Sequence, residues 1–201
     1  MNSAQVARRT TELVVRHPWL WRFLRGRLRD RFDELAPTWD TRIGPHHLTA
    51  LAAALEGLPA PRHVLDLGTG TGVAAQSLAR RYPEAEVVGV DLSAGMLEVA
   101  EAQLPDELRG RVRYQQADAS SLPFADEAFE LVVLVNMIPF FAELARVTAS
   151  GGHVVVSFSR GDETPIYVEP GTLRRELGAH DFVEFAEFSA PPATALRATK
   201  R

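Results

Sequence analysis

The chain has 201 residues, of which 46% are hydrophobic and 24% charged, with a formal net charge of −4. These values indicate one globular domain with a modest extension, and they exclude a mostly disordered chain. The sequence contains no cysteine, which excludes a disulfide scaffold, a thiolate metal site and a cysteine nucleophile. No apolar run approaches the roughly 20 residues of a membrane span, and no signal-peptide pattern is present, so we expect a cytoplasmic protein.

Charge is distributed unevenly along the chain. Residues 1–31 contain eight arginines and two acidic residues, a local balance of +6, which leaves −10 for the remainder. The acidic remainder disfavours a nucleic-acid partner, whereas the basic segment allows either contact with an anionic membrane surface or plain packing with solvated arginines. Arginine supplies 21 of the 22 basic side chains, a bias typical of GC-rich coding sequences that favours a bacterial source.

The first sixty residues are predicted to be helical. Pro18 fits the first turn of a helix, and apolar residues from Leu20 to Leu35 recur at helical spacing with arginines on the other side. Gly44 and Pro45 are expected to open a further helix. The predicted helices span about 3–16, 20–35 and 45–55, and we expect residues 1–58 to form an N-terminal helical cap.

From Arg62 onward, short β-branched runs alternate with helical patterns. This order predicts an α/β unit over residues 59–201, with a mostly parallel sheet and helices on both faces. The expected strands lie at 63–67, 86–90, 112–116, 131–135 and 154–158, with two closing strands at 182–188 and 195–199. The expected helices lie at about 73–81, 94–103, 140–148 and 171–178.

A glycine-rich turn follows the first of these strands, in the run Asp66-Leu67-Gly68-Thr69-Gly70-Thr71-Gly72. Glycine allows a ligand to approach the backbone closely and permits unusual dihedral angles. The helix that follows offers free N–H groups to a polar or anionic ligand. A tight turn without a ligand is the alternative, which three alternating glycines after a buried strand make less attractive.

Asp91 ends the second strand, 19 residues after Gly72. An acid there can accept hydrogen bonds from both ribose hydroxyls of NAD or of S-adenosylmethionine, and a solvated strand-end acid is the alternative. The dinucleotide pattern G-x-G-x-x-G/A fits only as Gly70, Gly72 and Ala75, which leaves Asp66 and Gly68 unexplained.

Five motifs in order make the sequence similar to the class I S-adenosylmethionine-dependent methyltransferases, nearest the ubiquinone/menaquinone-biosynthesis C-methyltransferase branch. The resemblance extends from about Arg62 to Phe158 and more loosely to the C-terminus. The motifs are Asp66–Gly72, Asp91-Leu92-Ser93, Gln116-Ala117-Asp118-Ala119 with Leu122-Pro123-Phe124, Phe129–Val132, and Glu143–Val147 with Ser150-Gly151-Gly152. The resemblance implies a Rossmann-like, seven-stranded sheet.

The resemblance also implies S-adenosyl-L-methionine as cofactor and places particular residues against it. Asp91 would accept from the ribose, Met96 would pack beside the adenine, and Asp118 would accept from the adenine amino group. The full implied set is Asp66, Gly68, Thr69, Gly70, Gly72, Asp91, Leu92, Met96, Asp118, Ala119 and Asn136.

The acceptor side carries weaker signals. Phe32, Ala36, Trp39 and Asp40 resemble a segment that closes over the cofactor in the C-methyltransferase branch, although Trp39 could simply pack the helices on the sheet. The loop after the fourth strand is apolar and lacks the histidine pair of many relatives. The candidate substrate residues are Trp39, His46, His47, Met137 and Phe140. No histidine pair has metal-ligand spacing, and no catalytic base is identified.

The sequence therefore predicts S_N2 transfer of a methyl group to a small-molecule acceptor, with the protein contributing mainly position and exclusion of water. Two alternatives remain open: a methyltransferase acting on RNA or protein, and a cofactor-binding partner subunit without catalysis.

Overall fold

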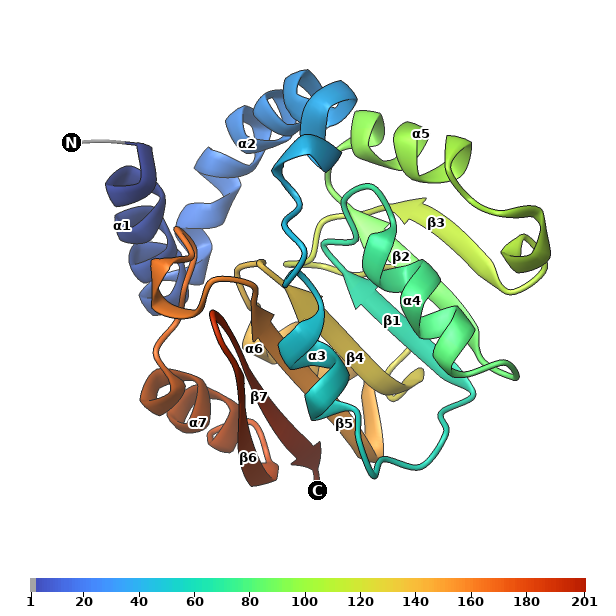
Figure 1. The fold of residues 1–201 in the computed structure, drawn as a ribbon. Coiled ribbons are helices and arrows are strands. Elements are labelled where there is room, and N and C mark those ends of the chain that lie inside the picture. Colours follow the sequence, from blue (N-terminus) through green and yellow to red (C-terminus); the bar gives the residue numbers. More distant parts are fainter. Residues whose placement is uncertain (1–2) are drawn as a thin grey trace.

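The computed structural model describes residues 3–201, so the first two residues of the predicted cap lie outside the described part. One sheet of seven strands runs through the molecule in the order β3-β2-β1-β4-β5-β7-β6 (Figure 1). The first five strands in this order pair in parallel, and β7 is antiparallel to both of its neighbours. The strands are β1 His63–Leu67, β2 Glu86–Asp91, β3 Val112–Gln116, β4 Phe129–Val135, β5 Thr148–Phe158, β6 Phe182–Ala190 and β7 Ala193–Lys200. The predicted seven-stranded, Rossmann-like sheet is confirmed.

Helices cover both faces of this sheet. The α-helices are α1 Ser3–Arg16, α2 Trp21–Leu35, α3 Thr49–Ala54, α4 Val73–Arg81, α5 Ala94–Ala102, α6 Phe141–Val147 and α7 Pro170–Gly178. Short 3₁₀ turns are η1 Pro18–Leu20, η2 Ala36–Arg42, η3 Asp106–Leu108 and η4 Gly161–Glu163. None of the helices within residues 3–201 is long and apolar enough to span a bilayer.

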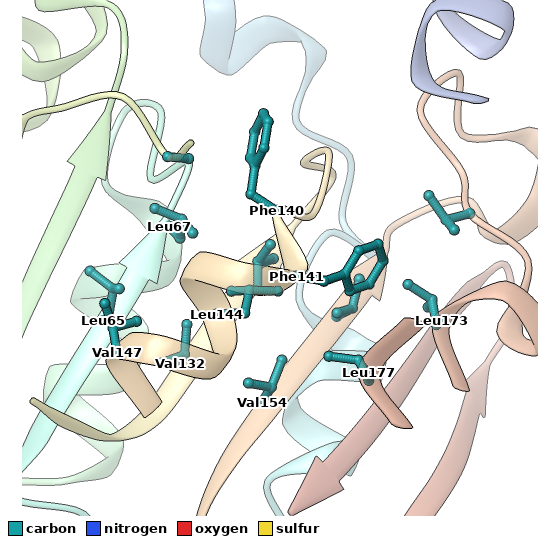
Figure 2. Close-up of a cluster of buried hydrophobic side chains, with 14 of the residues drawn as sticks. Leu65, Leu67, Val132, Phe140, Phe141, Leu144, Val147, Val154, Leu173 and Leu177 are labelled. Carbon is teal, nitrogen blue, oxygen red and sulfur yellow. The ribbon is translucent and has the colours of Figure 1, made fainter. Parts of the chain in front are cut away.

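The hydrophobic core consists of two clusters, one on each face of the sheet, because successive side chains of a strand point to opposite faces. Val64, Leu131 and Val133 pack against α3 and α4 on one face. Leu65, Val132 and others belong to the second cluster, which α6 and α7 cover with Leu144, Leu173 and Leu177, as Figure 2 shows.

The N-terminal helices lie over the carboxyl ends of the parallel strands, at the edge where the chain turns from strand to helix (Figure 1). Val14 of α1, Trp21 of α2 and Ala36 of η2 are buried, so the segment packs onto the body of the protein. Ligands of such sheets bind at this edge, beside the central strand pair where the connections diverge to opposite sides. Here that pair is β1 and β4.

Two predicted elements begin far from their expected starts, whereas the other boundaries agree within two residues. The third helix was expected over 45–55, but it begins at Thr49, because residues 44–49 form tight turns in which N–H groups bond to carbonyls three residues earlier, such as His47 N to Gly44 O. Strand β5 begins at Thr148 rather than at 154, so Ser150–Gly152 lies within it. The register shift between Phe129 and Leu131 absorbs the additional residues.

Candidate functional site

A cavity of about 150 Å³ lies between the carboxyl ends of β1, β2 and β4 and the N-terminal helices. Of the predicted cofactor residues, nine line it: Asp66, Gly68, Thr69, Gly70, Asp91, Leu92, Met96, Ala119 and Asn136. Gly72 and Asp118 lie outside its wall. Of the predicted substrate residues, Trp39, His47 and Met137 line the cavity, whereas His46 and Phe140 do not.

The glycine loop crosses from β1 to α4 above the end of β2. The N–H groups of Gly68 and Thr69 both donate to the carbonyl of Val90, at 2.8 and 2.9 Å. Gly72 caps α4 with φ +84°, and a Cβ on this residue would lie 2.2 Å from the Tyr114 hydroxyl oxygen. A residue with a side chain would be strained in this left-handed backbone and would clash with Tyr114, so the position requires glycine. Glycine here allows the loop to lie close against the sheet.

Asp91 holds the loop from the neighbouring strand. One carboxylate oxygen accepts from Gly70 N at 2.9 Å, and the other accepts from Ser93 N at 2.9 Å. Burial raises the pKa of this carboxyl, although these backbone donors act in the opposite direction. Each carboxylate oxygen has a second lone pair, so Asp91 retains the capacity to accept from ligand hydroxyls on the cavity side.

Asp66 lies beneath the loop and is 1% exposed. The Thr69 hydroxyl donates to it at 2.6 Å. Burial raises the pKa of Asp66 to about 7, against the opposing effect of the Thr69 hydrogen bond. The carboxyl is therefore partly protonated near neutral pH.

This shift makes the stability of the protein depend on pH. The folded pKa of about 7 exceeds the ordinary 3.8, so the contribution of Asp66 is complete below pH 3.8 and is lost as the pH rises through 7. We expect Asp66→Asn, which keeps an acceptor for Thr69, to gain about 2–4 kcal/mol of unfolding free energy relative to the wild type between pH 4 and pH 8. Urea titrations of both proteins across this range measure the difference. A constant difference would contradict the raised pKa.

Asp118 is engaged by the N-terminal helix. Trp21 Nε1 donates to one of its oxygens at 2.7 Å, and Arg25 donates to the other at 2.8 Å. Burial raises the pKa of Asp118, but the bonds from Arg25 and Ser120 outweigh it and the net pKa is lowered. Asp118, which is predicted to accept from the adenine amino group, thus also anchors α2.

The loop after β4 contributes Asn136 and Met137 to the cavity. Asn136 has φ +52°, and its side chain bonds to the Ser159 hydroxyl at 2.8 Å and to Ser159 N at 2.9 Å, which joins the ends of β4 and β5. Phe140 is buried beside Trp21, with ring centroids 5.3 Å apart, and does not line the cavity.

The N-terminal segment closes the cavity from above. The ring of Trp39 packs edge-to-face on Phe32, with centroids 5.6 Å apart, and lies over Gly70. Its neighbour Asp40 accepts from the Thr71 hydroxyl at 2.6 Å. His47 is half-buried in the wall and burial lowers its pKa, while His46 is exposed at the turn before α3.

Several residues of the site were missed from the sequence. Trp21 and Leu28 of α2 and Ile43 line the cavity, and Asp33 accepts from Ser93 Oγ at 2.5 Å and Gly95 N at 3.0 Å. Trp21 and Leu28 lie seven residues apart on one helix face, a spacing that predicts only packing. Within residues 3–201 no cluster of three metal-ligating side chains occurs.

Comparison with known proteins agrees with this geometry. Residues 64–152 match the model of a methyltransferase domain family. The chain is 45% identical over 141 residues to demethylmenaquinone methyltransferase of Thermus thermophilus, covering 62% of each protein. It is 38% identical over 142 residues to a ubiquinone/menaquinone biosynthesis C-methyltransferase of Syntrophotalea carbinolica, covering 64% of this chain and 59% of that protein. The chain thus spans about 60% of the length of these curated relatives.

A solved structure with the same fold is an S-adenosylmethionine-dependent methyltransferase of Thermotoga maritima, described as a possible histamine N-methyltransferase. It has a TM-score of 0.66 at 20% identity, over 86% of this chain and 99% of that one. Three observations point to the same kind of protein, a methyltransferase: the strand order, the glycine loop bonded to the strand-end acid Asp91, and the domain match over residues 64–152. Residues 64–152 therefore form a methyltransferase domain, and the chain is similar to the ubiquinone/menaquinone C-methyltransferase branch of the class I S-adenosylmethionine-dependent methyltransferases.

Proposed function

We propose that this chain binds S-adenosylmethionine and transfers its methyl group to a small apolar acceptor. The observation that carries the proposal is the juxtaposition of the Asp91 carboxylate and the glycine loop with a cavity roofed by Trp39 and Phe32. One part of this site is polar and suits a nucleoside, and the other is apolar.

The residues present fit the cofactor. Asp91 supplies acceptors for ribose hydroxyls, and Gly68 and Gly70 bring bare backbone to the cavity wall, beside Met137 and Trp39. Leu92, Met96 and Ala119 provide apolar surface suited to a flat base. Asp118 Oδ2 accepts one bond, from Arg25, so its second lone pair can accept from the adenine amino group if the base reaches it.

The bound cofactor supplies an electrophilic methyl group, so the chain itself needs mainly to position the acceptor and exclude water. Trp21, Trp39 and Met137 form apolar walls suited to both tasks. The lowered pKa of His47 keeps its imidazole neutral near pH 7 and able to accept a proton from an acidic acceptor.

The apolar lining favours a small apolar acceptor over RNA or a protein side chain, and the net charge of −10 outside residues 1–31 further disfavours RNA. The relatives named for demethylmenaquinone and for ubiquinone or menaquinone support a ring acceptor of this kind. We place the reaction in the cytoplasm. In this proposal residues 1–58 act as the cap and residues 59–201 as the cofactor-binding domain.

Isothermal titration calorimetry tests the proposal. We expect S-adenosylhomocysteine to bind and NAD to bind far more weakly, because the glycine pattern fits the methyltransferase motif. Tighter binding of NAD would overturn the cofactor assignment. Binding without turnover across a panel of phenolic and quinol acceptors would instead support a partner subunit without catalysis.

A further inference from the structure

Large apolar side chains are exposed at one place in the described residues, the first two helices and their connection. Val6 is 46% exposed, Leu13 52%, Trp19 58% and Phe23 61%. Val6 and Leu13 are seven residues apart and share one face of α1, while the rings of Trp19 and Phe23 contact edge-to-face with centroids 6.3 Å apart.

These exposed side chains lie on a different face of the helices from the one that packs against the rest of the protein. Thr11 and Val14 of α1 are buried, as is Trp21 of α2. The helices therefore present two apolar surfaces, one inside the fold and one outside it. Within residues 3–201 the outer surface is not part of the buried core.

Arginines are interleaved with the outer surface. Arg9 and Arg16 follow Val6 and Leu13 by three residues each and share their exposed face. The Arg22 guanidinium lies 4.5 Å from the centre of the Phe23 ring and 5.7 Å from that of Trp19.

The interleaved arginines have no internal carboxylate to neutralise them. Among the ion pairs of residues 3–201, none involves Arg9, Arg16 or Arg22. By contrast, Arg8 bonds to the carbonyls of Asp162 and Thr164, and Arg25 bonds to Asp118. Glu12 is the one nearby acid on α1, so the local charge stays positive.

We propose that this face, made of Val6, Arg9, Leu13, Arg16, Trp19, Arg22 and Phe23, docks on the surface of a bilayer containing anionic lipids. Aromatic rings settle at the level of the headgroups, aliphatic side chains insert just below them, and arginines bind lipid phosphates. A nucleic acid would match the arginines but would leave Val6 and Leu13 exposed to water. Charge and apolar surface together therefore select the bilayer.

The location of the face gives docking a consequence for the site. Trp21 lies between Trp19 and Phe23 in the sequence and lines the cavity from the inner side of α2. A docked protein would thus hold its cavity within one helix diameter of the lipid phase, where apolar acceptors concentrate. Docking itself does not depend on methyl transfer, so it is tested separately.

Vesicle sedimentation tests the proposal with the full chain. We expect binding to vesicles of phosphatidylcholine and phosphatidylglycerol in equal parts, at least tenfold weaker binding to phosphatidylcholine alone, and weakening by 0.5 M salt. Trp19 emission should shift to the blue on binding, and Trp19→Phe should abolish that shift. Trp19→Ser with Phe23→Ser should reduce binding at least tenfold.

Arg9→Gln with Arg16→Gln should also reduce binding, whereas the matched pair Arg62→Gln with Arg80→Gln, at the opposite edge of the sheet, should not. All four arginines are exposed, so these variants should fold, and their melting curves verify this. Several results would overturn the proposal: no vesicle binding, equal binding to both lipid compositions, or equal effects of the two arginine pairs. Tighter binding to duplex RNA, or a dimer that Trp19→Ser with Phe23→Ser dissociates, would assign the face to another partner.

Discussion

Replacing Gly72 by alanine should lower the free energy of unfolding by about 2–5 kcal/mol. The new methyl group would lie 2.2 Å from the Tyr114 hydroxyl oxygen and 2.7 Å from its ring carbon Cζ. Overpacking of this kind costs about 1–3 kcal/mol, and a left-handed backbone costs a residue with a Cβ about 1–2 kcal/mol more. Tyr114 cannot move aside freely, because its ring also lies against Gly89 in the neighbouring strand.

Gly110→Ala is the matched control, since nothing lies within 4 Å of the added methyl group and the backbone there needs no positive φ. Chemical denaturation of the three proteins measures the effect. A loss below 1 kcal/mol for Gly72→Ala would mean that Tyr114 does not hold the glycine loop against the sheet. The double variant with Tyr114→Phe should recover part of the loss.

Asp91→Ala should weaken binding of S-adenosylhomocysteine by about 10- to 150-fold, which corresponds to the roughly 1.5–3 kcal/mol carried by hydrogen bonds to a charged acceptor. The variant removes the proposed ribose acceptor and also releases Gly70 N and Ser93 N, so the loop loses its support. Both effects act in the same direction on binding.

Calorimetry on Asp91→Ala is compared with Asp106→Ala, an acid on the surface whose side chain is 97% exposed. The control should bind as the wild type does. Asp91→Asn separates the two effects, because its amide oxygen can still accept one of the backbone N–H groups. A folded Asp91→Ala protein with unchanged affinity would remove Asp91 from the cofactor site.

The sheet was predictable because its signals are local. Runs such as Val87-Val88 and Val154-Val155-Val156 have the continuous apolar character of strands buried on both faces. The glycine loop was predictable for the same reason, since its positive φ values require residues that can adopt them. The first residue of a helix was harder to predict, because no local sequence rule distinguishes the turns at 44–49 from the first turn of a helix.

Long-range side-chain contacts were beyond the reach of the sequence. Asp118 could be recognised as a motif acid, but its pairing with Trp21 and Arg25 spans more than ninety residues. Asp33 of α2 likewise bonds to Ser93 and Gly95, although its place among the charged residues of that helix predicts only a solvated acid. Such partners depend on where α2 crosses the sheet, which the helical periodicity does not specify.

The contacts of the N-terminal helices also determine when these helices can dock on the rest of the protein during synthesis. Arg8 bonds to the carbonyls of Asp162 and Thr164, at separations of 154 and 156 residues, and Trp21 reaches Asp118 across 97. During synthesis these helices leave the ribosome about 100 to 150 residues before their partners do. Contacts so distant in sequence form slowly. These helices are therefore translated well before they can dock, and their apolar inner face must remain uncovered until their partners emerge.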